Sequence, residues 1–269
     1  MRITFLGTGT SHGVPMIGCS CAVCRSDDPR DARTRVSILI ELGSALSEAS
    51  GPAAAESKGF RLLVDTSTDL RAQALRQGLD RIDAIFYTHA HADHIFGFDE
   101  LRRFNHLTRQ PLSAYGDART MAAIRKTFSY AYDPGAPKGG GVPDVRLWHA
   151  EGPFSMAGHD VTPVPVMHGT TPVNGIRIGR FAYVTDCNHI PAASMALLEG
   201  LDVLVIDALR RKAHPTHFTL DQAVSVASAL APRQTYFTHM AHDLPHAATC
   251  ASLPGGMALA HDGLVIECR

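Results

Sequence analysis

The chain has 269 residues, a hydrophobic content of 45%, a charged content of 19% and a formal net charge of −1. These values exclude collagen-like, coiled-coil and largely disordered chains, and they indicate a globular protein with a substantial core. Balanced charge offers no bulk attraction for nucleic acid or anionic lipid, so neither is expected as a partner. We recognise no membrane span and no secretory leader, and we therefore predict a cytoplasmic location.

The first third of the chain predicts short strands separated by loops. Apolar runs bounded by glycine or polar residues predict strands at residues 3–6, 36–42, 60–65 and 84–88. A helix is expected over residues 70–78, where apolar side chains recur every three or four positions before a closing glycine. Residues 43–59 are rich in Ala, Ser, Gly and Glu, a composition that predicts an exposed insertion rather than core.

The rest of the chain continues the alternation of strands and helices. Strands are expected at residues 112–115, 161–166, 181–185, 203–206 and 234–237, and helices at residues 118–130, 191–199 and 219–230. Residues 133–144 hold four glycines and three prolines, which predicts a loop that could cover a site. We find neither an internal repeat nor a long linker, so residues 1–269 are predicted to form one layered α/β domain.

The strongest functional signal follows the strand predicted at residues 84–88. Four potential metal ligands, His89, His91, Asp93 and His94, lie in one short run there. Histidines two positions apart in a loop can converge on one ion, and the following Asp and His can turn toward a second. Imidazole and carboxylate are ligands that zinc, manganese and iron accept. Solvated loop histidines are the alternative, but a run of this length at a strand end favours a metal site.

Two complete coordination spheres need more ligands than this run supplies. His168, Asp186 and His239 each come just after one of the later predicted strands. Proteins of the α/β class place their chemistry at the carboxyl ends of strands, so these three residues are the candidates. Any one of them, taken singly, could instead be a cap or a surface residue.

A second cluster consists of cysteines. Cys19, Cys21 and Cys24 form a C-x-C-x-x-C run, which in a chain without a recognised leader favours metal ligation over disulfides. A structural zinc site takes four ligands, and His242, three residues beyond His239, is the candidate for the fourth. Free buried thiols remain the alternative for this run.

The motifs, taken in chain order, resemble the metallo-β-lactamase superfamily over nearly the whole chain. The resemblance implies a four-layer αββα sandwich with a dinuclear site at one edge of its two sheets. It implies that one divalent ion is held by His89, His91 and His168, and that the other is held by Asp93, His94 and His239. Asp186 would bridge the two ions, and Asp65 would orient the ligand loop unless it is a simple turn residue. The cofactors implied are two zinc or manganese ions and one structural zinc at the cysteines.

The glycine-rich loop at residues 7–15, followed by the cysteine run, is similar to the cyclic-phosphate phosphodiesterase branch of that superfamily. This implies a small cyclic phosphodiester, such as phosphoribosyl 1,2-cyclic phosphate, as the substrate. Asp93 and Asp186 would be catalytic through the ions, and His217 would protonate the leaving alcohol, unless it only makes a local hydrogen bond. The basic run at residues 210–212, formed by Arg210, Arg211 and Lys212, could bind a second phosphate or be a solvated surface.

Three other functions stay open from the sequence. They are a pyrroloquinoline-quinone biosynthesis B-like protein, a tRNA-processing ribonuclease and a thioester or lactone hydrolase. The intact H-x-H-x-D-H motif favours a hydrolase over a carrier, and the net charge of −1 gives no support for tRNA binding. Thioester and lactone hydrolases of the superfamily generally lack the cysteine run. A homodimer is left open.

Overall fold

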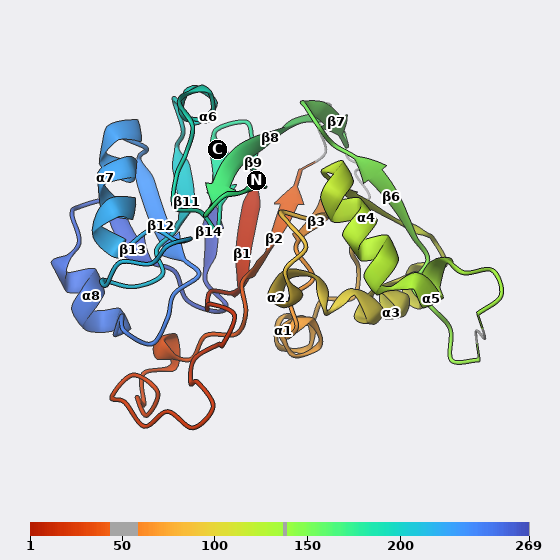
Figure 1. The fold of residues 1–269 in the computed structure, drawn as a ribbon, viewed down its shortest axis with the longest axis horizontal. Helices are drawn as coiled ribbons and strands as arrows, with labels where there is room; N and C mark the ends of the chain where they lie inside the picture. The colour runs from red at the N-terminus through yellow and green to blue at the C-terminus, as the bar shows by residue number, and fades with distance from the viewer. Residues whose placement is uncertain (44–58, 137–138, 269) are drawn as a thin grey trace, which may run out of the picture.

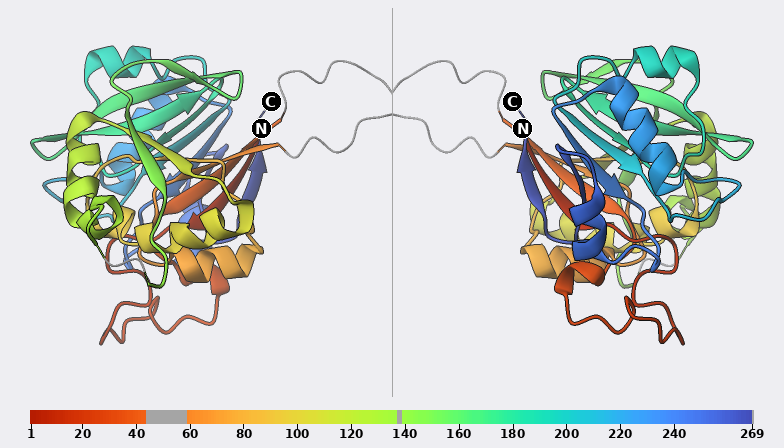
Figure 2. Two further views of the ribbon diagram at one scale, coloured as in Figure 1. Left: turned by 90° about the vertical axis from the view of Figure 1, so that its right-hand side faces the viewer. Right: turned by 90° about the vertical axis from the view of Figure 1, so that its left-hand side faces the viewer.

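The computed structural model describes residues 1–43, 59–136 and 139–268, which form two facing seven-stranded sheets. In spatial order, the first sheet consists of β14 (Val265–Glu267), β1 (Arg2–Gly7), β2 (Ser37–Leu42), β3 (Phe60–Val64), β4 (Ala84–Phe86), β5 (Leu112–Gly116) and β6 (Val145–His149). The second sheet consists of β13 (Met257–Leu259), β12 (Gln234–Thr238), β11 (Val203–Asp207), β10 (Phe181–Val184), β9 (Thr171–Ile178), β8 (His159–His168) and β7 (Phe154–Met156). Figures 1 and 2 show the two sheets side by side in the middle of the molecule.

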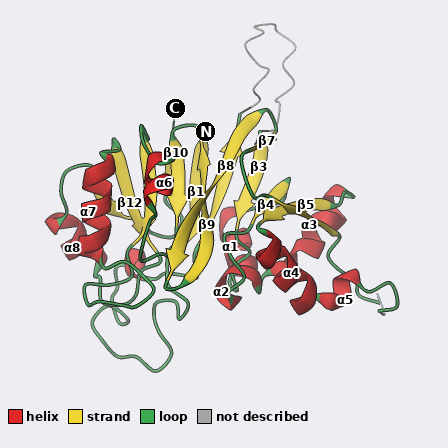
Figure 3. Cartoon of the chain, turned by 45° about the horizontal axis from the view of Figure 1, so that its top comes forward, coloured by secondary structure: helices red, strands yellow, loops and turns green. Residues whose placement is uncertain are grey.

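Helices lie on the outer face of each sheet (Figure 3). The first sheet is covered by α1 (Leu70–Gln77), α2 (Ala92–Ile95), η2 (Phe98–Glu100), α3 (Leu101–Thr108), α4 (Ala118–Thr127) and α5 (Ser129–Tyr132). The second sheet is covered by α6 (Ala192–Ala196), α7 (Leu220–Leu230) and α8 (His246–Ser252). A further short helix, η1 (Pro29–Asp31), lies in the loop after β1. This is the predicted αββα layering.

Strand side chains alternate between two apolar environments, which explains why the sequence shows continuous apolar runs. In β10, Phe181 and Tyr183 point into the core between the sheets, whereas Ala182 and Val184 pack under the helices of the outer layer. Successive side chains of a strand face opposite sides of the sheet, so a sheet covered on both faces needs apolar residues at every position.

The structure divides one predicted helix and adds strands that the sequence did not predict, of which β9 is the longest. The helix predicted over residues 118–130 is two helices, because the backbone leaves the helical region at Phe128 between α4 and α5. Strand β9 was not predicted, since Pro172, Asn174 and Gly175 favour turns. Its pairing with β8 imposes the strand, and a Cβ at Gly175 would lie 2.7 Å from the carbonyl oxygen of Tyr183.

The insertion expected at residues 43–59 stays a prediction, because residues 44–58 lie outside the described residues. The segment 133–144 has neither helix nor strand over residues 133–136 and 139–144, and none of these residues belongs to the ligand groups described below. No helix in the described part of the chain is long and apolar enough to cross a membrane.

A fully buried arginine fastens the loop after β1 to the loop after β12. The backbone of Arg33 exchanges hydrogen bonds with that of Val14 at 2.7 and 2.8 Å. Its guanidinium donates to the carbonyl oxygens of Ala241 and Leu244 and lies 3.3 Å from the Asp31 carboxylate. Burial lowers the pKa of this guanidinium. The two loops that carry Cys19 to Cys24 and His242 are therefore held together from inside.

We predict that Arg33→Met lowers the free energy of unfolding by about 3–5 kcal/mol, because it leaves the charge of Asp31 and two carbonyl oxygens without their buried partner. Urea denaturation in one metal-replete buffer measures the change. The matched control is Arg30→Met, which removes an exposed pair with Asp28 and should change the free energy by less than about 1 kcal/mol. Equal effects of the two substitutions would contradict the role given to Arg33.

Candidate metal centre

The carboxylate of Asp186, two residues beyond the end of β10, lies at the centre of the site. Its Oδ1 atom is 3.2 Å from Nε2 of His239 and 3.9 Å from Nε2 of His89, and its Oδ2 atom is 3.2 Å from Nε2 of His94. The hydroxyl of Thr185 donates to Oδ2 at 2.7 Å and fixes the carboxylate plane. One carboxylate thus faces three imidazoles that come from both sheets.

Asp186 takes part in three groups of potential ligands whose donor atoms lie within 4.8 Å of one another. The groups consist of Asp186 with Asp93, His94 and His239, with His89 and His91, and with His168 and His217. The structure therefore brings together the seven residues that the sequence singled out for the dinuclear site. By ring distance, His168 also approaches His91, at 5.1 Å between centroids. His217 was assigned a different role from the sequence, yet it lies among these residues.

Three residues at the site have an unusual backbone. Asp65, Asp186 and His239 follow β3, β10 and β12, and their φ angles are 62°, 54° and 60°. Side chains other than glycine rarely adopt this left-handed region, and holding one there costs of the order of 1–3 kcal/mol. Beyond each of these strand ends, the side chain contacts another residue of the site. The strain is located where the ligand groups meet.

The outer nitrogen of His94 is anchored by a buried carboxylate. Oδ2 of Asp65 accepts hydrogen bonds from Nδ1 of His94 at 2.7 Å and from the hydroxyl of Thr88 at 2.8 Å. Oδ1 of Asp65 accepts from the backbone N–H of Thr88 at 2.8 Å. Burial raises the pKa of Asp65, and these donors oppose that shift. Asp65 therefore fixes the tautomer of His94 and leaves its Nε2 facing Asp186.

Two more imidazoles are oriented in the same way. Because the hydroxyl of Thr88 donates its only proton to Asp65, it accepts from Nδ1 of His89, at 3.0 Å. Nδ1 of His168 donates to the carbonyl oxygen of Thr216 at 2.9 Å. In both residues the second ring nitrogen, Nε2, is left for another partner.

The unsatisfied atoms of the site fit divalent cations. Among the described residues, the Nε2 atoms of His89, His94 and His239 are buried and have no hydrogen-bond partner. Burial opposes a charge on His94, yet the carboxylates of Asp186, Asp93 and Asp65 together raise its pKa well above the usual value. Buried ring nitrogens without a hydrogen-bond partner and buried carboxylates are both costly. Zinc or manganese would satisfy both kinds of donor.

Asp207, the last residue of β11, was missed from the sequence. Its Oδ2 atom lies 3.2 Å from Nδ1 of His217 and accepts from the backbone N–H of Phe218 at 3.1 Å. Its Oδ1 atom is 3.5 Å from Nδ1 of His239, and the His217 and His239 rings stack at 4.7 Å between centroids. The signal was available, because Asp207 comes directly after the strand predicted at residues 203–206, the same pattern that singled out Asp186.

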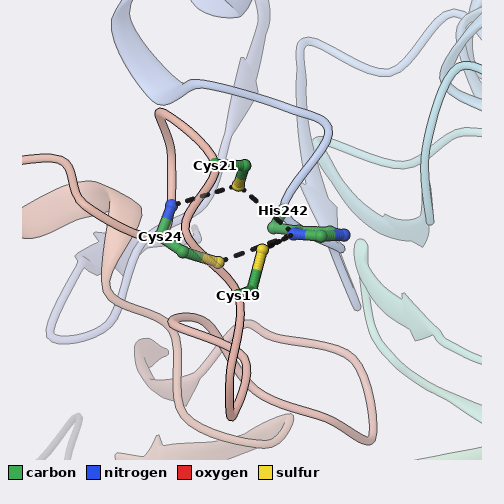
Figure 4. A group of neighbouring side chains, drawn as sticks. All are labelled: Cys19, Cys21, Cys24 and His242. Carbon is green, nitrogen blue, oxygen red and sulfur yellow. Dashed lines mark hydrogen bonds between the residues drawn. The ribbon is translucent and has the colours of Figure 1, made fainter.

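The cysteine run and His242 form a second group of potential ligands, shown in Figure 4. Nδ1 of His242 lies 3.2, 3.3 and 3.5 Å from the sulfur atoms of Cys19, Cys21 and Cys24. With zinc–sulfur and zinc–nitrogen distances of about 2.3 and 2.05 Å, tetrahedral coordination separates sulfur from nitrogen by about 3.6 Å. The four side chains therefore converge at nearly the spacing that one zinc ion requires.

The pKa values of the thiols agree with the interpretation of the cysteines and His242 as a zinc site. The backbone N–H of Cys24 donates to the sulfur of Cys21 at 3.4 Å and lowers the pKa of that thiol to about 6. Burial raises the pKa of the Cys24 thiol to about 11. One thiolate is thus available near neutral pH, and a bound cation would favour the others.

Comparison with known proteins identifies the fold family. The beta-lactamase superfamily domain matches residues 60–240. The chain belongs to the β-lactamase superfamily. A solved structure described as a new diphosphatase from the PhnP family is 43% identical, with a TM-score of 0.88, and the match covers 100% of this chain and 98% of that chain. At the level of the superfamily, the predictions of an α/β sandwich and of a metal-dependent hydrolase are confirmed.

Other known proteins are similar to this chain over part of their length or in fold alone. The octanoyltransferase of Porphyromonas gingivalis is 36% identical over 98% of this chain, but the chain spans only 51% of that protein. The Zn²⁺-bound PqqB of Methylobacterium extorquens has a TM-score of 0.78 at 20% identity, with both chains fully covered. The chain spans about half or less of the length of the curated relatives it matches.

We predict about three metal equivalents in protein purified without a chelator, two at the Asp186 site and one zinc at the cysteines. Elemental analysis measures them. Cys21→Ser should lose about one zinc equivalent and keep the other two, because the two ligand groups share no side chain. A total near one, with no zinc lost in Cys21→Ser, would show that this assignment is wrong.

Proposed function

We propose that the chain is a dinuclear metal-dependent phosphodiesterase that hydrolyses a small cyclic phosphodiester such as phosphoribosyl 1,2-cyclic phosphate. The observation that carries this proposal is the position of Asp186, one buried carboxylate shared by groups of ligands on either side of it. The 43% identity to a diphosphatase of the PhnP family supports chemistry at phosphorus.

Seven side chains would hold the two ions. His89, His91 and His168 would hold one ion, Asp93, His94 and His239 the other, and Asp186 both. When bound, the ions supply an activated water and positive charge for the phosphate oxygens. Asp65, Thr88 and Thr216 keep the imidazoles in register by binding their outer nitrogens. Because these partners are themselves buried or backbone atoms, the donor set needs little reorganisation during the reaction.

His217 would donate the proton that the leaving alkoxide needs. Its Nδ1 atom donates to Asp207, so Nε2 is the nitrogen left to act on the substrate. The carboxylate of Asp207 thereby fixes the orientation of the His217 ring. The ring also stacks on His239, which holds it beside the ligand groups. The same position would allow His217 to bind an ion, and the experiment below separates the two roles.

The other superfamily functions have less support. The tRNase Z and PqqB structures are 20% identical to this chain and show the fold alone. The octanoyltransferase name belongs to a protein nearly half of which has no counterpart here. A comparison of bis(p-nitrophenyl) phosphate, a thioester and a lactone as substrates of the metal-replete protein tests the proposal. Faster turnover of the thioester or lactone would contradict it.

We predict that Asp186→Ala abolishes turnover while the fold survives. The substitution removes the carboxylate shared by the two ions, and loss of such a ligand should cost more than about 1.4 kcal/mol of transition-state stabilisation. Initial rates with bis(p-nitrophenyl) phosphate measure the loss, and circular dichroism checks the fold. A variant that keeps more than about a tenth of the wild-type rate would count against a dinuclear mechanism.

We predict that His217→Ala lowers kcat by roughly 10²–10⁴ with a cyclic ribose phosphate, whose alkoxide leaves poorly without a proton. The loss should shrink with a p-nitrophenyl ester, because p-nitrophenolate departs unprotonated. Metal content should not change. An equal loss with both leaving groups would point to phosphate binding, and a loss of metal would make His217 a ligand.

A further inference from the structure

A cavity of about 310 Å³ opens beside His217. Its walls come from three segments that are distant in the sequence. Residues 10–13 and Met16 lie in the segment that leads into the cysteine run, Leu209, Arg210 and His214 follow β11, and residues 241–243 follow β12. The volume is at the lower end of the range for small-molecule sites, which suits a sugar phosphate rather than a polymer.

His217 stands between this cavity and the ligand groups. Its ring contacts those of His168 and His239 at 4.6 and 4.7 Å between centroids, and it also lines the cavity. If His217 protonates the leaving oxygen, the rest of the leaving group must extend past His217 into this space. This step rests on the proposed function.

Two charged side chains line the cavity, one of each sign. The Arg210 guanidinium donates through Nε to the carbonyl oxygen of Lys212 and through Nη2 to that of Ala213, both at 3.1 Å. Among the described residues, no carboxylate lies within 4.0 Å of it, so its charge is uncompensated and its position is fixed. Asp243 is exposed and likewise has no ion-pair partner in the described part of the chain.

We propose that this cavity binds the leaving group and that Arg210 and Asp243 determine its specificity. Arg210 binds one anionic substituent, a phosphate or a carboxylate, and Asp243 accepts hydrogen bonds from hydroxyl groups. A fixed guanidinium suits a phosphate because its remaining N–H groups form charge-assisted hydrogen bonds. The carboxylate of Asp243 disfavours further negative charge, so the preferred leaving group is hydroxylated and carries a single anionic group.

The neighbouring basic residues do not share this role. Arg211 and Lys212 do not line the cavity, although the sequence suggested all three basic residues as one phosphate site. Their exposed side chains correspond to the solvated alternative. Arg211→Gln is therefore a control that removes the same charge one residue away.

Two ribose-based substrates that differ in one phosphate test the proposal. Ribose 1,2-cyclic phosphate and its 5-phosphorylated form share the reacting diester. Arg210→Gln should lower kcat/KM for the phosphorylated substrate by roughly 10- to 100-fold, the effect of losing a hydrogen bond to a charged group. It should leave the other substrate within about threefold. Arg211→Gln should change neither, and Arg210→Lys should recover part of the loss because it restores the charge.

A binding measurement separates this proposal from the proposed function. Titration calorimetry of the metal-replete protein with ribose 5-phosphate and with ribose measures the affinity of the cavity for each compound in the absence of turnover. Wild type should bind the phosphate more tightly than ribose, and Arg210→Gln should abolish that difference. The same affinity of Arg210→Gln and Arg211→Gln for ribose 5-phosphate, or no preference in wild type, overturns the proposal. Binding without hydrolysis of either cyclic substrate would instead overturn the phosphodiesterase assignment alone.

Discussion

Burial of negative charge is the constraint on which the rest of this structure depends. The carboxylates of Asp93 and Asp186 are both buried and belong to one group of potential ligands, where an uncompensated charge would cost several kcal/mol. The protein supplies imidazoles rather than lysines or arginines around them. Protonated imidazoles can compensate these carboxylates, as the raised pKa of His94 indicates, and the same ring nitrogens can give up their protons to bind divalent cations. The charge of the carboxylates is therefore compensated in either form of the site.

The layered fold serves this constraint by bringing strand ends together. Asp65, Asp186 and His239 each lie within two residues of a strand end, and each adopts a left-handed backbone. Parallel neighbours such as β10, β11 and β12 end at one edge, so residues about twenty to thirty positions apart become neighbours. The buried partners of the outer imidazole nitrogens, Thr88 and Asp207, come from the same edge. Position in the sheet, more than local sequence, selects the ligands.

This explains which parts of the fold and site were predictable. The H-x-H-x-D-H run and the polar residues after apolar strands are local patterns, and they gave the ligand groups and most central strands. Asp207 shows the same pattern, directly after the strand predicted at residues 203–206, and was overlooked. Strand β9 and the role of Arg33 were out of reach, because the first is imposed by pairing with β8 and the second by burial against Ala241 and Leu244.

The two groups of ligands are mechanically joined although they share no side chain. His239 and His242 lie on one short loop, and the intervening Met240 exchanges backbone hydrogen bonds with Thr8 and Thr10 at 2.9 and 3.1 Å. A displacement of the cysteine run would therefore also displace the loop that carries His239. The same segments wall the cavity beside His217. Zinc at the cysteines would then act on catalysis by keeping one metal ligand and the leaving-group pocket in register.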